Sequence, residues 1–375
     1  MTAFNKPFMT GRELDYIREA VSSMKISGDG KFTHLCHDFF EKRYGFKKVL
    51  LTSSCTDALE MAAILIDTEP GDEIIMPAYT FVSTANAFVL RGANIIFADC
   101  NAENPNIDAD VIEGLITKKT KAIVPVHYAG IACDMDKIMA LADKYNLFVI
   151  EDAAQSIESY YKNRPLGSIG HMAAFSFHET KNIISGEGGM LVINNESFIK
   201  RAEIIREKGT NRSAFFRGEI NKYGWVDIGS SFLPSDIIAA FLYAQLENIE
   251  KIQSRRRHLW QLYWDKLNPL VQKGIIKLPH LPEYASNNGH MFYIICNSLD
   301  ERTNLIEHLK SFDIPAVFHY LSLHRSPFYK KKYTGKPLPY SDLYSDCLLR
   351  LPMYYELTNE ESEKISTLIQ EFYSK

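Results

Sequence analysis

Short apolar runs alternate with stretches of helical periodicity over the first half of the chain. Runs short enough for buried strands are at residues 48–51, 73–76, 94–98, 122–125, 147–150, 173–177 and 190–193. Apolar residues recur every three or four positions, as in helices, at residues 55–66, 83–90 and 134–145. Because strands that alternate with helices form a mostly parallel sheet covered by those helices, we expect a large α/β domain.

The pattern changes after about residue 235. Residues 236–262 have apolar spacing of helical period without an internal breaker, which predicts one long helix leaving the large domain. Prolines and an Asn-Asn-Gly cluster at 287–289 then mark a new start. Beyond it we expect a smaller α+β domain with elements at 290–297, 303–311, 316–320 and 360–373. The predicted division is 1–250 for the large domain and 251–375 for the small one.

Composition and charge narrow the class of protein. A chain of 375 residues is too long for one small core, and its 46% hydrophobic content is ordinary for a globular protein. The net charge of −4 gives no general attraction to nucleic acid or to an anionic membrane. No apolar stretch approaches the ~20 residues of a membrane helix, and we see no signal peptide, so we expect a cytoplasmic protein.

The cysteines and histidines do not indicate a metal site. The six cysteines are scattered without a C-x-x-C pair, which fits reduced thiols. His34 and His37 flank Cys36 at helical spacing, but no second pair of ligands lies nearby in the sequence. We therefore expect no metal.

Four segments that follow candidate strands carry the residue types of a binding site. They are residues 52–59, 77–84, 150–155 and 175–182, the last followed by a glycine-rich stretch at 186–189. In an open α/β sheet, ligands bind outside the carboxyl ends of the strands. We therefore expect the four segments to meet at one site.

The first two segments suit a phosphate and a flat ring. Small hydroxyl residues open the helix after residue 52, and a helix N-terminus offers unpaired N–H groups to an anion. Simple N-capping by a serine or an aspartate would explain the same residues. Phe81, on a loop after a strand, could stack on a ring, although packing in the core is the alternative.

The other two segments suit acid–base chemistry. Asp152 ends a predicted buried strand, where an unpaired carboxylate is costly unless it meets a cation such as a protonated pyridine nitrogen. A helix cap or a structural ion pair is the alternative. Lys181 lies between apolar strands and the glycine-rich stretch, which makes it a candidate Schiff-base lysine whose pKa burial would lower. A surface charge is the alternative for a single lysine.

Taken in order, these segments resemble the sugar-nucleotide aminotransferases of the DegT/DnrJ/EryC1/StrS family, which are fold-type I enzymes dependent on pyridoxal 5'-phosphate (PLP). The resemblance covers essentially the whole chain. Its motifs are S-C-T-D-A-L at 54–59, P-A-Y-T-F-V-S-T at 77–84, V-P-V-H-Y-A-G at 124–130, E-D-A-A-Q at 151–155, F-S-F-H-E-T-K-N at 175–182, G-E-G-G at 186–189, His319-Tyr320 with His324, and 349–353.

The resemblance implies roles for individual residues. Lys181 would form a Schiff base with PLP and then act as general acid and base, and Asp152 would pair with the pyridine nitrogen. Phe81 would stack on the ring, and Gln155 would contact its hydroxyl. The residues that would hold the phosphate are Cys55, Thr56 and Ser176. Members of the family are homodimers in which a neighbouring subunit completes the site.

Three positions depart from the pattern of the family. Cys55 stands where many members have glycine, a change that leaves a backbone N–H contact possible. Glu187 stands where aspartate is common. In residues 229–236, Ser231 replaces an asparagine that often reaches the phosphate of the partner, so we expect a hydroxyl contact across the dimer.

Residues 177–182, 205–212 and 227–231 are similar to a subgroup that makes TDP-4-amino-4,6-dideoxygalactose for enterobacterial common antigen. The resemblance implies transfer of the amino group of L-glutamate to C4 of TDP-4-keto-6-deoxyglucose. A glucose-configured C4 amine, a 3-keto sugar substrate and a non-catalytic sugar-nucleotide-binding protein are the alternatives. Dehydratases of the family carry histidine at the lysine position, so Lys181 argues against that activity. The candidate substrate contacts are Arg212, His319, Tyr320 and His324, of which the last three could equally be packing residues.

Overall fold

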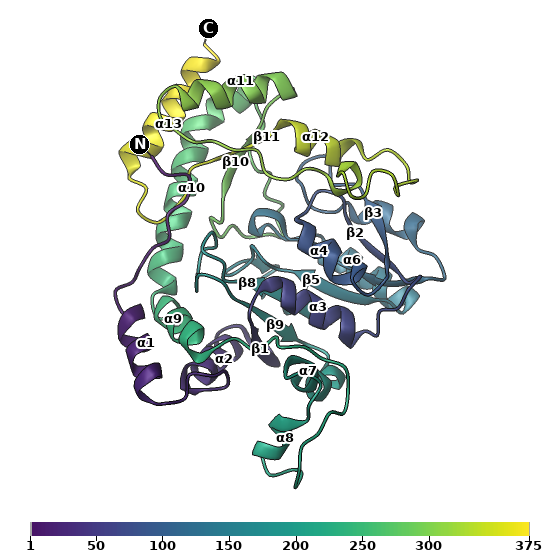
Figure 1. Ribbon diagram of the computed structural model, residues 1–375. Coiled ribbons are helices and arrows are strands. Elements are labelled where there is room, and N and C mark those ends of the chain that lie inside the picture. The colour runs from purple at the N-terminus through teal and green to yellow at the C-terminus, as the bar shows by residue number, and fades with distance from the viewer. Residues whose placement is uncertain (1, 375) are drawn as a thin grey trace.

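A seven-stranded sheet with helices on its faces forms the centre of the computed structural model, which describes residues 2–374 (Figure 1). The strand order is β1-β9-β8-β5-β4-β2-β3. Only β9 is antiparallel to its neighbours, so the predicted mostly parallel sheet is confirmed. The strands are β1 (Lys48–Thr52), β2 (Glu73–Pro77), β3 (Asn94–Ala98), β4 (Thr120–Ile123), β5 (Phe148–Asp152), β8 (Met172–Ser176) and β9 (Gly189–Ile193).

The strands are short apolar runs because both faces of the sheet are buried. Helices α3 (Cys55–Leu65), α4 (Val82–Val89) and α6 (Met135–Tyr145) follow strands as the periodicity predicted. Small residues of α3 pack against the side chains of β8 and β9, such as Ala174 and Leu191. The remaining elements before residue 235 are α5 (Ala109–Ile112), the β6–β7 hairpin (Tyr160–Tyr161 and Arg164–Pro165), α7 (Ile199–Arg206) and α8 (Arg212–Phe216).

Two helices precede the first strand and were not predicted. Helices α1 (Glu13–Ser22) and α2 (Lys31–Tyr44) pack against α9 (Asp236–Leu246). The buried carboxylate of Asp236 accepts hydrogen bonds from the backbone N–H groups of Phe32 and Thr33, so a residue distant in sequence caps the start of α2. This long-range cap has no local sequence signal.

The predicted single helix at 236–262 is wrong. Helix α9 ends at Leu246, and a second helix, α10 (Ile249–Gln272), begins after two residues. Asn248 leaves the helical conformation, with φ −112° and ψ 13°, and its side-chain amide donates to the carbonyl of Ala244 at 3.1 Å. That hydrogen bond replaces a backbone one and lets the chain change direction.

The last hundred residues form a second hydrophobic core around α10. Strands β10 (Phe292–Ile295) and β11 (Leu348–Leu351) pair antiparallel. The surrounding helices are α11 (Leu299–Lys310), α12 (Pro339–Cys347) and α13 (Asn359–Phe372). Residues 316–320 do not form the expected regular element and make one bridge, from Val317 to Arg350. The division after residue 250 stays a prediction, and it falls in the first turn of α10.

None of the helices within residues 2–374 combines the length and the apolar character that crossing a bilayer requires.

Candidate active site

An open cavity of about 590 Å³ lies at the carboxyl ends of the central strands. Residues from the range 319–353 also line it. Most of the predicted site residues line it. They are Cys55, Thr56, Phe81, Asp152, Gln155, Ser176, Lys181, His319 and Tyr320. The structure thus gathers residues that are up to 265 positions apart in sequence, Cys55 and Tyr320 being the most distant pair (320 − 55).

One end of the cavity is formed by the N-terminus of α3. The hydroxyl of Ser54 accepts from the N–H of Asp57 at 3.0 Å and caps the helix. Thr56 donates its hydroxyl to Ser83 at 2.8 Å, and Ser176 lines the same cavity from the end of β8. Burial, and then the charge of Asp152, raises the pKa of the Cys55 thiol, which is therefore neutral. An anion here meets N–H and hydroxyl donors without an opposing thiolate.

Gly189 lets β9 pass directly beside this helix end. A Cβ on Gly189 would lie 2.4 Å from the backbone N of Cys55 and 2.4 Å from the carbonyl carbon of Ser54. Real Cβ atoms do not approach backbone so closely, so a side chain here would displace the loop between β1 and α3. The last glycine of the G-E-G-G motif is thus required by this close approach.

Asp152 lies deeper in the cavity as a carboxylate without a cation. Its oxygens accept from the hydroxyl of Thr84 at 2.7 Å and from the N–H of Ala154 at 3.2 Å. Burial raises its pKa, and the hydrogen bond from Thr84 only partly offsets that effect. Within residues 2–374, no Lys, Arg or His nitrogen lies within 4.0 Å of its carboxylate. The group is thus set to receive a cation from a ligand.

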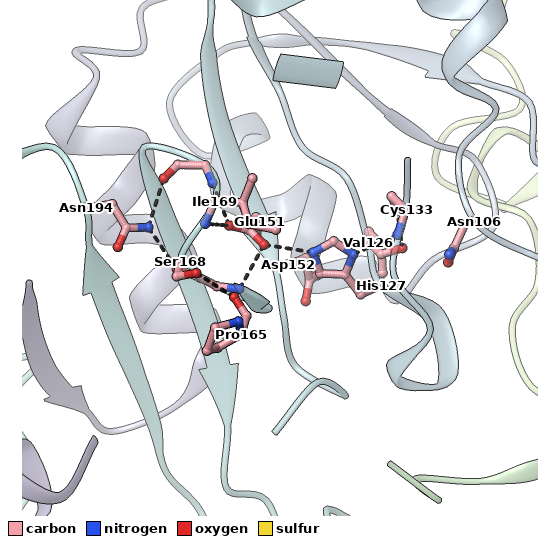
Figure 2. A network of polar contacts seen from close by, with 12 residues as sticks. Asn106, Val126, His127, Cys133, Glu151, Asp152, Pro165, Ser168, Ile169 and Asn194 are labelled. Carbon is pink, nitrogen blue, oxygen red and sulfur yellow. Dashed lines mark hydrogen bonds and ion pairs between the residues drawn. The ribbon is translucent and has the colours of Figure 1, made fainter. Parts of the chain in front are cut away.

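The strand end that carries Asp152 is fixed by its neighbour, Glu151 (Figure 2). Glu151 points to the opposite side of β5 and accepts from the N–H groups of Gly167, Ile169 and Gly170 at 2.6–2.8 Å. His127 lies 3.0 Å from it and accepts from the N–H of Cys133 at its other ring nitrogen, which makes Nε2 the donor to Glu151. Although burial opposes it, the bond from His127 helps to lower the pKa of Glu151.

Lys181 enters the cavity from the loop after β8. Its backbone N–H donates to the carbonyl of His178 at 2.9 Å, which fixes the turn. Burial lowers the pKa of its amine, and the positive charge of Arg350 acts in the same direction. The lysine is thus closer to the neutral, nucleophilic form than a surface lysine is.

The aromatic wall combines both halves of the chain. Phe81 leaves 54% of its surface exposed, and its ring centroid lies 6.0 Å from that of Tyr320. The amide of Gln155 accepts from the N–H of Ala129 at 2.6 Å and donates to the hydroxyl of Tyr320 at 3.0 Å. One of its amide hydrogens is still unused. The ring of His319 stacks on Tyr320, which orders this part of the wall.

Three predicted residues do not line the cavity of their own chain. Ser231 is exposed and bridges Glu207. Arg212 lies 3.5 Å from the same Glu207. His324 is buried and pairs with Asp342 at 3.3 Å.

Three residues that line or support the cavity were missed. Asn288, which is fully buried, donates to the carbonyls of Gln155 and Ile157, both at 2.8 Å. His290 lies 2.9 Å from the side-chain oxygen of Asn182, next to Lys181. Arg350 lines the cavity from β11. In the sequence, the Asn-Asn-Gly cluster at 287–289 indicates only the start of a new segment. Nothing local in the sequence marks Asn288 as buried.

This donor set matches the chemistry of PLP group by group. A helix N-terminus with hydroxyls fits the phosphate, and a buried carboxylate that lacks a cation fits the protonated pyridine nitrogen. A lysine of lowered pKa fits the aldehyde. Within residues 2–374, no group of three or more His, Cys, Asp or Glu side chains is arranged to hold a metal ion.

Comparison with known proteins agrees with this geometry. A protein of Methanocaldococcus jannaschii described only as uncharacterized, MJ1066, is 32% identical over 384 aligned positions that cover 100% of this chain and 98% of its own. The aminotransferase from Psychrobacter cryohalolentis has 27% identity and a TM-score of 0.91 over 98% of both chains. Streptococcus pneumoniae Spr1654, provisionally described as a sugar aminotransferase, has 25% identity and a TM-score of 0.91 in its PMP form, over 100% of this chain and 99% of that one.

The model of one family matches almost the whole chain, from residue 7 to residue 370. Lys181, Asp152 and the other predicted residues that line the cavity all lie within the matched part. The chain therefore belongs to the DegT/DnrJ/EryC1/StrS aminotransferase family.

Proposed function

We propose that the protein is a PLP-dependent sugar aminotransferase that moves the amino group of L-glutamate to C4 of TDP-4-keto-6-deoxyglucose. The products would be TDP-4-amino-4,6-dideoxygalactose and 2-oxoglutarate, for cell-surface polysaccharides such as enterobacterial common antigen. The observation that carries the proposal is that one cavity holds both a lysine whose pKa is lowered by burial and a buried carboxylate without a cation.

Some of these residues would hold the cofactor, and Lys181 would also transfer protons. PLP, when bound, supplies an electron sink for the carbon that loses its proton. Asp152 keeps the ring nitrogen protonated, and the N-terminus of α3 with Thr56 and Ser176 binds the phosphate. Lys181 would hold the aldehyde of the cofactor, and its amine, when free, would move the proton as general acid and base. Phe81 covers one ring face, and the unused amide hydrogen of Gln155 is available to the ring hydroxyl.

We further propose that the enzyme acts as a homodimer with shared sites. Helix α8 and the loop after it project from the rest of the molecule (Figure 1). This arm exposes large apolar side chains, namely Phe216, Tyr223, Trp225, Val226 and Ile228. Such a surface is costly in water and is typical of an interface. Ser231 and Arg212, which lie at the base of the arm, would then reach the cavity of the partner.

The substrate assignment is tested by an end-point assay. PLP-loaded protein is incubated with L-glutamate and TDP-4-keto-6-deoxyglucose, and the C4 configuration of the product is read from NMR coupling constants. An axial amine is the expected result. An equatorial amine would replace the product with the glucose-configured one. Formation of 2-oxoglutarate without an aminated C4 sugar would exclude this sugar as the amino acceptor. Sugar nucleotides with a 3-keto group would then be the next substrates to test.

A further inference from the structure

Arg350 is a cation without a partner in the wall of the cavity. It lies on β11, where its backbone pairs with Tyr293 on one side and bridges Val317 on the other. No carboxylate within residues 2–374 lies within 4.0 Å of its guanidinium, and its Nε is buried without a hydrogen-bond acceptor. Burying such a donor without a partner destabilises the folded protein. An unpaired guanidinium in the wall of a cavity is suited to binding an anionic ligand.

The guanidinium is held in place without using its N–H groups. Its carbon lies 5.0 Å from the ring centroid of Phe4, and the backbone on both sides of the strand is fixed. Phe4 itself lines the cavity, as do Leu351 and Met353 beyond the arginine. Stacking orders the side chain and leaves the planar edge with its donors free.

Arg350 lies in the wall of the same cavity as Lys181. It is the only arginine among the described residues that line the cavity. Lys181, His319 and Tyr320 line the same cavity, and the charge of Arg350 adds to the effect of burial in lowering the pKa of Lys181. The N-terminus of α3 already offers donors to a phosphate, so Arg350 serves a second anion.

We propose that Arg350 binds a carboxylate of the amino donor beside Lys181. This inference rests on the proposed function. A guanidinium edge matches a carboxylate with two parallel hydrogen bonds. An anionic donor would also give the half-buried guanidinium the ionic partner that it lacks. The diphosphate of a sugar nucleotide is the other anion that the same edge could take.

The test compares Arg350→Met and Arg350→Lys with wild type, all loaded with PLP. Glutarate serves as an unreactive dicarboxylate probe and TDP as a probe for the nucleotide, and both dissociation constants are measured by calorimetry. The first half-reaction is followed separately, as 2-oxoglutarate released from L-glutamate without any sugar. Arg302→Met is the matched control because Arg302 also stacks on an aromatic ring, that of Phe318, but does not line the cavity.

We expect Arg350→Met to weaken glutarate binding about 10- to 100-fold, the value of a charge-assisted hydrogen-bond pair, and to leave TDP binding unchanged. Its kcat/KM for L-glutamate should fall by a similar factor, Arg350→Lys should recover part of the loss, and Arg302→Met should match wild type. Weakened TDP binding with unchanged glutarate binding would overturn the proposal in favour of the diphosphate. Unchanged binding of both probes in a folded variant would reduce Arg350 to a structural role.

The outcome is separable from failure of the proposed function. If wild type releases 2-oxoglutarate but aminates no sugar, the acceptor is wrong and the Arg350 comparison still stands. If wild type releases no 2-oxoglutarate, the proposed function fails. The Arg350 proposal then fails only if wild type and Arg350→Met bind glutarate equally, including the case in which neither binds it.

Discussion

At the scale of single residues, the site depends on two groups whose protonation is set by burial. Lys181 has a lowered pKa and Asp152 a raised one, each chiefly because the charged form is removed from water. Burial therefore destabilises the charged form of each group when no ligand is bound. Each group is suited to a ligand of complementary chemistry. PLP presents both, an aldehyde for the amine and a pyridinium for the carboxylate.

Replacing the lysine should remove catalysis without unfolding the protein. In Lys181→Ala we expect the transfer of amino groups to fall below detection and the visible absorption band of bound cofactor to change, because the covalent anchor is gone. The melting temperature of the cofactor-free protein should not drop. Lys144→Ala, which removes an exposed lysine paired with Glu113, is the control and should keep full activity. Wild-type turnover by Lys181→Ala would end the proposed role.

Replacing the aspartate separates function from stability. Asp152→Asn should lower the rate of transfer about a thousandfold, since the pyridine nitrogen loses its anionic partner. At neutral pH, the free energy of unfolding of the cofactor-free variant should exceed that of cofactor-free wild type by about 1 kcal/mol, because a buried unpaired charge is removed.

The pH dependence of that gain has a definite sign. The folded pKa of Asp152 is raised, so its ionisation costs stability as the pH rises through that value. The advantage of Asp152→Asn should therefore shrink toward zero as the pH falls below about 4, the ordinary range of aspartate. Denaturant titrations at several pH values measure it. A gain that grows at low pH would contradict the sign.

The motifs around Lys181 and Asp152 were enough to predict both residues from the sequence. Arg350 was not predicted, because its importance comes from what is absent around it in three dimensions. Asn288 was also missed, since its contacts with Gln155 and Ile157 join segments more than 130 residues apart. Such properties depend on tertiary packing and leave no local pattern.

At the scale of elements, the start of α3 depends on how closely β9 passes it. Gly189→Ala should destabilise the protein by about 2 kcal/mol and weaken PLP binding, because the new methyl group would push the Ser54–Cys55 backbone away. Gly114→Ala is the control, since a Cβ there meets no atom within 4 Å. Equal melting temperatures and equal PLP affinities for the two variants would show that the close approach has no energetic consequence.

The seven strands of the sheet were predicted because each is a short apolar run that both faces of the sheet bury. The boundary between α9 and α10 was missed because Asn248 and Glu247 are compatible with a helix interior. Tertiary contacts decide the break, with Glu247 accepting the hydroxyl of Tyr16 at 2.7 Å. Residues 316–320 form no regular element, because His319 and Tyr320 line the cavity and only Val317 bridges a strand.

At the scale of the whole molecule, the projecting arm should determine the oligomeric state. Trp225 leaves 84% of its surface exposed, the largest fraction among the apolar side chains named on the arm. Trp225→Glu should raise the dissociation constant of the dimer at least tenfold, because a charge would enter a desolvated interface. Sedimentation velocity over a range of concentrations measures the change. Phe312→Glu, at an exposed position after α11, is the control, and a monomeric wild type would contradict the proposed dimer.

The central claim is that the cavity around Lys181 is where PLP and the amino donor meet. The most direct measurement is reduction of the PLP-loaded protein with borohydride, which makes the link between cofactor and lysine permanent, followed by peptide mapping by mass spectrometry. We predict that the pyridoxyl mass lies on Lys181 alone and that prior addition of L-glutamate prevents the modification. Modification of a different lysine, or labelling of Lys181 that L-glutamate does not affect, would contradict the claim.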